Sequence, residues 1–219
     1  MAQQLRWGEE IPADLNDARR RLLDAAEACF AQFGVAKTTV EDVAAKAKVS
    51  RATVYRYFDG RDEVLLGVLL REAGRFLGKL DKRIKRETDF ATAIADGVLF
   101  TVAAVRADPH LALLFAPDAA GITSEIAGAS EALFEYNADF LRPRLEQAKA
   151  NGDLRAGLDI EEAAEWILRT ILSLLSVKGP VVRSEAASRR FLMTFLIPAL
   201  VADPPAVTPR PRRRTTPLR

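Results

Sequence analysis

Two arginines and two tyrosines lie within seven residues of one another, at Arg51, Tyr55, Arg56 and Tyr57. The whole chain of 219 residues has only three tyrosines. A protein core favours leucine at such positions, and an ordinary solvent-facing helix favours Glu, Lys or Ala. Guanidinium groups fork onto guanine or phosphate, and a tyrosine hydroxyl reaches phosphates or base edges. The cluster therefore indicates a surface that binds something outside the protein.

Two short helices are expected to position this cluster. Thr39 precedes the segment VEDVAAKA and has Asp42 three residues later, which predicts a capped helix over 40–47. Ser50 can cap a second helix over 51–57. The AKVS between them is too short for anything but a tight turn. The two helices must therefore cross steeply, as in a helix-turn-helix.

The second helix should present one side to the outside. Val54 and Phe58 lie four residues apart and can pack against the first helix. The residues left on the neighbouring arc are Arg51, Ala52, Tyr55 and Arg56. Such an arc suits the major groove of DNA, where arginine forks onto guanine and a methyl group contacts thymine.

The net charge of +2 is unevenly distributed. Residues 17–61 carry 9 Lys or Arg against 6 Asp or Glu, and residues 203–219 carry 5 Arg against one Asp, whereas 62–202 has an excess of acids. A polyanion-binding head on a neutral body would have this pattern, but so would an ordinary solvated face.

The whole chain is predicted to be all-α, because apolar residues recur at spacings of three and four residues. Runs in which Val, Ile or Thr alternate with polar residues, as in strands, are missing. The predicted helices span 17–33, 40–47, 51–57, 61–86, 90–106, 109–115, 122–150, 159–177 and 185–202. We expect four parts: a disordered N-terminal arm at 1–16, a three-helix helix-turn-helix DNA-binding domain at 17–61, a larger helical effector-binding and dimerisation domain at 62–202, and a disordered Arg/Pro-rich tail at 203–219.

The scarcity of cysteine and histidine excludes two classes of site. With Cys29 alone no internal disulfide can form, and with His110 as the one histidine a Cys/His zinc site cannot be assembled. Cys29 lies on the inner stripe of its helix and is expected in the core. Neither a signal peptide nor a membrane span is evident, so we expect a cytoplasmic protein without metal or cofactor.

The segment from about Arg21 to Leu70 resembles the DNA-binding domain of the TetR family of transcriptional regulators. It reads LLDAAEACFAQFGVAKTTVEDVAAKAKVSRATVYRYFDGRDEVLL, with the family's landmarks in order and in register over about 45 residues. Two positions depart from the pattern: Lys48 replaces the usual glycine of the turn, and Arg61 replaces the usual lysine. A left-handed Lys48 would cost about 1 kcal/mol relative to glycine.

The resemblance implies that residues 51–57 form the recognition helix. Thr39, Tyr57 and Arg61 are then expected to contact phosphates, and Arg51, Ala52, Thr53 and Tyr55 to lie near bases or the adjacent backbone. The full set of expected DNA contacts is Thr39, Lys48, Ser50, Arg51, Ala52, Thr53, Tyr55, Arg56, Tyr57 and Arg61.

The predicted helices at 159–177 and 185–202 are apolar on more than one face, which indicates a second partner. We expect a two-fold homodimer held by a four-helix bundle, an arrangement that the resemblance also implies. Its two recognition helices would face half-sites about 34 Å or more apart on a near-palindromic operator. The expected interface residues are Ile167, Ile171, Leu174, Leu175, Phe191, Phe195 and Leu196.

Aromatic and apolar residues between 74 and 170 can surround one cavity for a largely apolar small-molecule effector. Phenylalanines at helical spacing are also ordinary core residues. The expected lining residues are Phe76, Leu99, Phe100, Phe115, Phe134, Asn137, Phe140, Trp166 and Arg169.

These features predict a DNA-binding transcriptional regulator, most simply a repressor released from a palindromic operator by a small apolar ligand. An activator, a ligand-independent DNA-binding protein and a helical protein-interaction scaffold stay open as alternatives. The sequence has no GxSxG, GxxxxGK or HExxH motif, so an enzyme is not expected.

Overall fold

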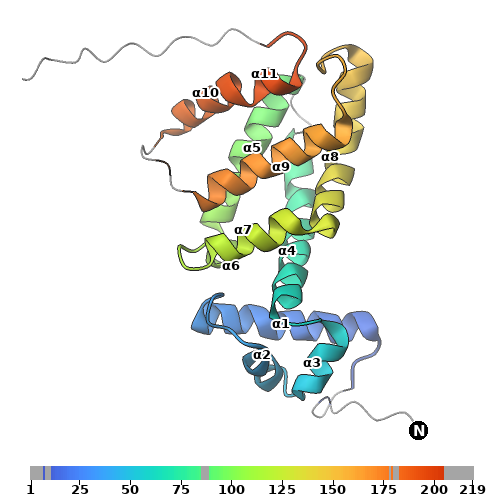
Figure 1. Cartoon of the computed structure of the whole chain (residues 1–219), viewed down its shortest axis with the longest axis vertical. Helices are drawn as coiled ribbons and strands as arrows, with labels where there is room; N and C mark the ends of the chain where they lie inside the picture. The colour runs from blue at the N-terminus through green and yellow to red at the C-terminus, as the bar shows by residue number, and fades with distance from the viewer. Residues whose placement is uncertain (1–6, 8–10, 85–88, 178, 180–182, 205–219) are drawn as a thin grey trace, which may run out of the picture.

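The computed structural model describes residue 7 and residues 11–84, 89–177, 179 and 183–204, with the backbone alone at 83 and 84. Eleven helices make up this part of the chain, which confirms the predicted all-α fold (Figure 1). They are α1 (Leu15–Phe33), α2 (Val40–Lys46), α3 (Arg51–Tyr57), α4 (Arg61–Ile84), α5 (Phe90–Ala107), α6 (Pro109–Leu114), α7 (Ala120–Ala129), α8 (Glu131–Asn151), α9 (Ile160–Ser176), α10 (Glu185–Phe195) and α11 (Ile197–Leu200).

Two predicted helices are each divided in two. The predicted helix at 122–150 breaks at Ser130, whose hydroxyl accepts a hydrogen bond from the Leu133 N–H and so begins α8. The predicted helix at 185–202 breaks at Leu196, next to α11 with Pro198 in its first turn. Apolar periodicity continues through both breaks, which is why it predicted single helices there.

The two ends of the chain lie only partly within the described residues. The predicted disorder of the tail falls outside them from residue 205 on, as does that of the N-terminal arm at 1–6 and 8–10. Within the arm, Trp7 is buried, and α1 begins at Leu15, two residues before the predicted domain.

The helix-turn-helix forms through the predicted caps. Thr39 and Asp42 complete a capping box at the start of α2, and the Ser50 hydroxyl accepts from the Thr53 N–H at 3.1 Å at the start of α3. Val54 and Phe58 are fully buried in the core that α3 shares with α1 and α2, as predicted. Lys48 has φ 57°, so the turn has the left-handed conformation that glycine usually supplies.

Helix α4 joins the helix-turn-helix to the larger helical body, as Figure 1 shows. Its first half buries Val64, Leu65 and Val68 against α1, in one hydrophobic cluster with Leu111 and Leu114 of α6. The helix-turn-helix and the lower end of the body therefore share a continuous core.

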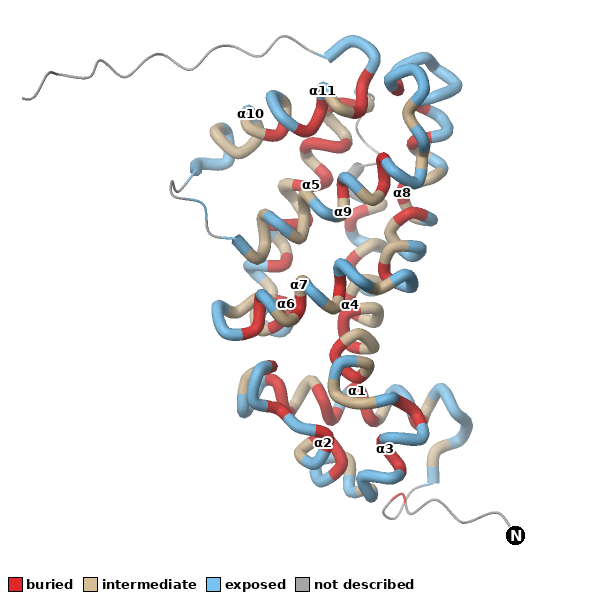
Figure 2. Tube along the Cα trace, in the orientation of Figure 1, coloured by how far each residue is buried: buried red, intermediate tan, exposed pale blue. Residues whose placement is uncertain are grey.

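Helix α5 lies at the centre of the body. By length and composition alone it is long and apolar enough to cross a membrane. Here it packs against α4, α6, α9, α10 and α11, and buried residues recur along it (Figure 2). Its apolar composition is that of a core helix. Cys29 of α1 is also buried, which confirms it as a core residue.

Candidate functional site

One side of α3 is exposed at the free end of the helix-turn-helix. Arg51, Ala52, Tyr55 and Arg56 are all exposed, with Tyr55 46% accessible, as the helical arc predicted. The Ser50 hydroxyl caps the start of this helix by accepting from the Thr53 N–H. The exposed face thus combines two guanidinium groups, a methyl group and a phenol.

The Arg51 guanidinium is held within this face by two neighbours. It forms an ion pair with Glu41 of α2, with 2.7 Å between Nη1 and Oε1, and it lies over the Tyr55 ring at 5.7 Å. Its hydrogen bond with Tyr55 and the nearby Glu41 carboxylate raise the pKa of Arg51 above its ordinary value. The sequence reasoning missed Glu41, although its exposed position early in α2 is readable from the capping box.

Two residues that the resemblance placed at DNA face inward instead. Thr53 is 5% exposed, and its hydroxyl is hydrogen-bonded to that of Ser50. Tyr57 is buried edge-on against Trp7, with 6.0 Å between ring centroids, and its carbonyl accepts from Arg19. Both side chains fix α3 against the domain, so we assign them to positioning. Trp7 was missed because its partner is 50 residues away in sequence.

Arg61 is bonded to the protein's own backbone. Its Nε donates to the Thr38 carbonyl at 2.9 Å and its Nη2 to the Val35 carbonyl at 2.7 Å, both in the α1–α2 loop. Its Nη1 contacts Asp62. These bonds make Arg61 an anchor for the loop that carries Thr39, a role that competes with the expected phosphate contact.

The remaining expected contacts lie at the edges of the face. Thr39 is exposed, and its hydroxyl donates to Asp42 at 2.7 Å. Lys48 and Ser50 are exposed in the turn between α2 and α3, and the structure adds the exposed Lys46 beside them. We use the name α3 face for Thr39, Lys48, Ser50, Arg51, Ala52, Tyr55 and Arg56.

A cavity of about 150 Å³ lies in the larger body, lined by residues of α4 to α9. Four of the nine expected lining residues do line it: Phe76, Phe115, Asn137 and Phe140. The others lie elsewhere. Leu99 packs against the hydrophobic cluster that α5 shares with α8, α9, α10 and α11. Phe100 stacks on Phe76, with 5.8 Å between ring centroids, and does not line the cavity. Phe134 and Arg169 border a separate depression, and Trp166 is 47% exposed.

Three polar side chains of the cavity wall, those of Thr101, Asn137 and Glu72, are bonded within the protein, and a fourth, Tyr136, is 41% exposed. Asn137 donates to the Ala164 carbonyl at 3.2 Å, and the Thr101 hydroxyl donates to the Gly97 carbonyl at 2.8 Å. Glu72, the one charged side chain among the described lining residues, is paired with Arg75. The wall therefore offers a ligand mostly carbon.

Glu72 lies at the junction between the cavity and the DNA-binding domain. Burial raises the pKa of Glu72; the Arg75 guanidinium opposes this rise and the Glu27 carboxylate of α1 adds to it. Arg71, the preceding residue of α4, pairs with Glu27 at 2.5 Å and with Asp24 at 2.7 Å. This charged group ties α1 to α4 beside the cavity.

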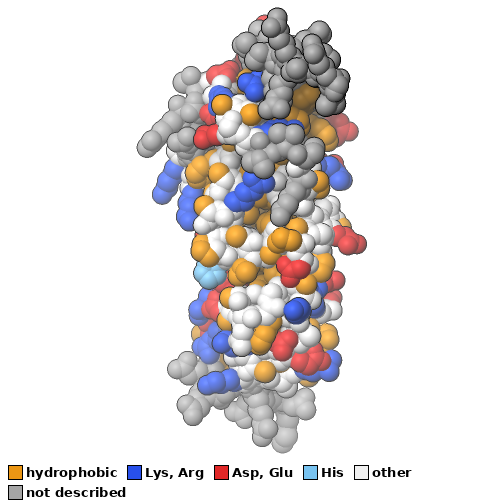
Figure 3. All heavy atoms as spheres, turned by 90° about the vertical axis from the view of Figure 1, so that its left-hand side faces the viewer, with side chains coloured by type: hydrophobic (Ala, Val, Ile, Leu, Met, Phe, Trp, Pro, Cys, Tyr) orange, Lys and Arg blue, Asp and Glu red, His pale blue; other side chains and the backbone are white. Residues whose placement is uncertain are grey.

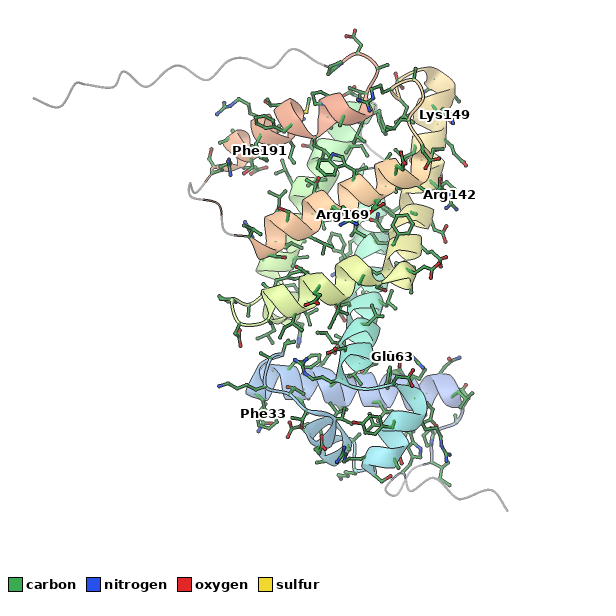
Figure 4. The ribbon with its side chains drawn as sticks, viewed as in Figure 1. Phe33, Glu63, Arg142, Lys149, Arg169 and Phe191 are labelled. Atoms are coloured by element: carbon green, nitrogen blue, oxygen red, sulfur yellow. The ribbon has the colours of Figure 1, made fainter. Side chains whose placement is uncertain are left out.

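The expected dimer residues separate into two groups. Ile167, Ile171 and Leu175 line the cavity, and Ile167 is 3% exposed, so they face the interior of the same chain. Leu174, Phe191, Phe195 and Leu196 border a groove between α9 and α10, together with Trp166 and Arg169. Figure 4 shows Phe191 and Arg169 on these two helices.

The groove between α9 and α10 has large exposed apolar side chains at its edge. Phe195 is 64% exposed, and Trp166 nearly half. On the side shown in Figure 3, hydrophobic side chains are interspersed along the middle of the body, and charged ones lie toward both ends. Across the described part of the chain, no three His, Cys, Asp or Glu side chains gather in a way that could hold a metal ion.

Comparison with known proteins decides the family. Residues 22–68 match the family described as bacterial regulatory proteins, tetR family. An HTH-type transcriptional regulator of Mycobacterium tuberculosis is 32% identical over 181 residues, which cover 83% of this chain and 84% of that protein. The chain belongs to the TetR family. It is a TetR-type DNA-binding transcriptional regulator, and its relatives are regulators rather than enzymes.

Solved TetR-family structures share the fold along nearly the whole chain. A TetR-family regulator from Pectobacterium atrosepticum aligns with a TM-score of 0.62 at 18% identity, over 90% of this chain and all of that one. SmeT, the repressor of the Stenotrophomonas maltophilia multidrug efflux pump SmeDEF, aligns with a TM-score of 0.52 at 29% identity, over 89% of this chain and 97% of SmeT. A SmeT complex with triclosan aligns with a TM-score of 0.50 at 28% identity, over 90% and 99%.

Proposed function

We propose that this TetR-family protein is a homodimeric repressor that leaves its operator when a small, uncharged, apolar molecule enters the cavity. The observation that carries this proposal is the shared wall of the cavity and the DNA-binding domain. Leu69, Leu111 and Leu114 line the cavity and also belong to the hydrophobic cluster that contains Val54 and Phe58 of the helix-turn-helix.

Operator binding is assigned to the α3 face. Arg51 is placed to fork onto guanine, the Ala52 methyl to contact thymine, and Tyr55 and Arg56 to reach base edges or backbone. The exposed Lys46 and Lys48 add sequence-independent attraction to phosphates. Direct readout and phosphate contact therefore come from the same side of the domain.

The ligand class follows from the chemistry of the wall. Because the polar groups of Thr101, Asn137 and Glu72 already have partners, a charged ligand would be buried without a counter-charge. An uncharged ring or hydrocarbon chain gives up no hydrogen bonds when it enters such a cavity, and burying its apolar surface away from water favours binding. The triclosan complex of SmeT, a 28% identical relative, is consistent with a ligand of this kind.

The size of the cavity supplies a mechanism of release. Its volume of about 150 Å³ is below the roughly 300 Å³ at which ligand pockets usually begin. A larger ligand would have to displace part of the wall, and two of the lining helices, α4 and α6, pack directly on α1. The ligand then favours a conformation in which the α3 faces of the dimer no longer match adjacent grooves.

Dimerisation is assigned to the groove between α9 and α10. Phe195 and Trp166 expose large apolar surface at its edge, and a second copy of these two helices would bury it in a four-helix arrangement. A symmetric dimer explains how two α3 faces could read a palindrome.

In vitro selection from random duplex DNA, followed by fluorescence anisotropy on the enriched sequence, tests the proposal. We expect a palindromic sequence, salt-dependent binding, and release by uncharged aromatic compounds of one or two rings. The effector role fails if no such compound changes either operator affinity or the melting temperature of the protein. A promoter–reporter assay with the same operator separates repression from activation.

A further inference from the structure

The ion pair between Glu41 and Arg51 places an acidic side chain inside an otherwise basic face. The two side chains come from different helices, at the second residue of α2 and the first residue of α3. Their closest atoms are 2.7 Å apart, and the side chains are 52% and 58% exposed. The carboxylate therefore lies where a nucleic acid would approach.

Folding does not account for this pair. An ion pair between two half-exposed side chains contributes little to stability, because water screens the charges and both chains lose rotamer freedom. The two helices are already fixed by the capping box of α2, the Ser50 cap and the buried Val54 and Phe58. The main effect of the pair is therefore on the Arg51 guanidinium.

The contacts of Arg51 hold that group in one orientation. Glu41 binds it at one edge while the Tyr55 ring lies beneath it at 5.7 Å. A guanidinium reads guanine only when its planar fork meets O6 and N7 together, so orientation decides the contact more than charge does. Held by Glu41, Arg51 also has less freedom to turn toward a phosphate.

We propose that Glu41 is a positioning residue that sets operator specificity by orienting Arg51 and by opposing contact with phosphates of any other sequence. The proposal rests on the assignment of the α3 face to DNA. A carboxylate in this place lowers affinity for all duplexes through repulsion from phosphates, and the oriented Arg51 restores affinity only where a guanine is present. The ratio of specific to non-specific binding rises as a result.

Two variants separate orientation from charge. Glu41→Asp keeps the negative charge but withdraws the carboxylate by one methylene, whereas Glu41→Gln removes the charge. Asp62→Asn is a matched control, because Asp62 is an exposed acid in the first turn of α4, next to the helix-turn-helix, and its described contact is Arg61. Arg51→Ala identifies the base pair that Arg51 reads.

The experiment uses the full-length protein and the sequence that the wild type selects from random duplex DNA. Affinities are measured for that sequence, for each of its single base-pair variants and for a scrambled duplex, over a range of salt. Both Glu41 variants should lose about fivefold or more of the discrimination at the base pair identified by Arg51→Ala. Glu41→Gln alone should bind the scrambled duplex about two- to fivefold more tightly in low salt, with a salt slope steeper by up to about one unit per half-site.

Three results would overturn the inference. If both Glu41 variants keep the wild-type preference at the base pair read by Arg51, Glu41 does not position Arg51. If they lose preference at a different base pair, Glu41 reads a base itself and the positioning role is wrong. If the wild type selects no sequence, the proposed operator binding fails, and the role of Glu41 fails with it. This result differs from the first two, in which the wild type selects an operator but Glu41 does not position Arg51.

Discussion

Replacing Arg61 with alanine should destabilise the DNA-binding domain without changing its count of phosphate contacts. Arg61 donates two hydrogen bonds to the Val35 and Thr38 carbonyls, which lie 26 and 23 residues earlier in the chain. Val35 and Thr38 are each 1% exposed, so the loop between α1 and α2 is packed around these bonds. The substitution leaves both carbonyls without their donor.

The magnitude follows from the kind of bond that is lost. A hydrogen bond from a charged donor contributes about 1.5–3 kcal/mol net, and two of them are removed. The Arg61 side chain is 27% exposed, so water can replace part of the loss. We therefore expect the free energy of unfolding to fall by about 2–4 kcal/mol, a large fraction of the roughly 5–15 kcal/mol of a typical domain.

Urea unfolding followed by circular dichroism measures this change, at one protein concentration because a dimer's stability depends on it. Arg56→Ala is the matched control, since Arg56 is exposed on α3 and should change stability by no more than about 0.5 kcal/mol. The salt slope of operator binding gives the second readout. The reasoning is refuted if Arg61→Ala costs less than about 1 kcal/mol while the salt slope falls by about one unit per half-site, because Arg61 would then be a phosphate contact.

Four further substitutions test the cavity, the buried Glu72 in its wall, and the groove between α9 and α10. Because burial raises the pKa of Glu72, the folded state holds this proton more tightly than the unfolded state, so stability is lost as pH rises from about 4.5 through the raised pKa. Glu72→Gln should therefore be more stable than the wild type at pH 7 and lose that advantage below about pH 4.5; equal urea midpoints at pH 7 would contradict this. Ala73→Leu places three more carbons at the cavity wall and should stabilise the apo protein by up to about 2 kcal/mol while abolishing the thermal shift caused by apolar ligands. Ile167→Ala should cost about 2–5 kcal/mol in urea unfolding because Ile167 is buried, whereas Phe195→Ala should leave the fold intact and weaken self-association in sedimentation; a dimer unaffected by Phe195→Ala would place the interface elsewhere.

Local sequence signals were sufficient for the helix-turn-helix. The Thr39 and Ser50 caps act over three residues, and Val54 and Phe58 lie four apart on one helix, so all of these relations are visible in the chain. The exposed arc of α3 followed from the same spacing. The predicted arc is exposed in the structure because the side of a seven-residue helix that faces solvent depends only on the spacing of its few buried residues.

The breaks at Ser130 and Leu196 show where periodicity misleads. Apolar residues continue on both sides of each break, because Ala127 and Leu133 beside Ser130 share one hydrophobic cluster, and Leu192 and Ile197 beside Leu196 share another. A cap at Ser130 and a proline two residues after Leu196 were readable as helix boundaries. The continuous apolar pattern outweighed them.

Contacts between distant segments were decided by the tertiary structure alone. The Arg61 guanidinium matches the family's phosphate-binding pattern by position, yet carbonyls more than 20 residues away accept its hydrogen bonds. Trp7 packs against Tyr57, although we predicted that its segment is a disordered N-terminal arm. No periodicity encodes such pairs, because each depends on where two separate stretches of chain meet.

Helix α9 gives the same distinction within a single element. Its sequence is apolar on more than one face, from which we predicted a second partner, and that dimer stays a prediction. Ile167 and Ile171 turned out to face the cavity, and Trp166 and Leu174 the groove beside α10. The sequence determined how much apolar side-chain surface this helix has to bury, because that amount follows from its composition. Only the packing of α5, α7 and α8 around it determined which side is the inside, because burial depends on where the neighbouring helices lie.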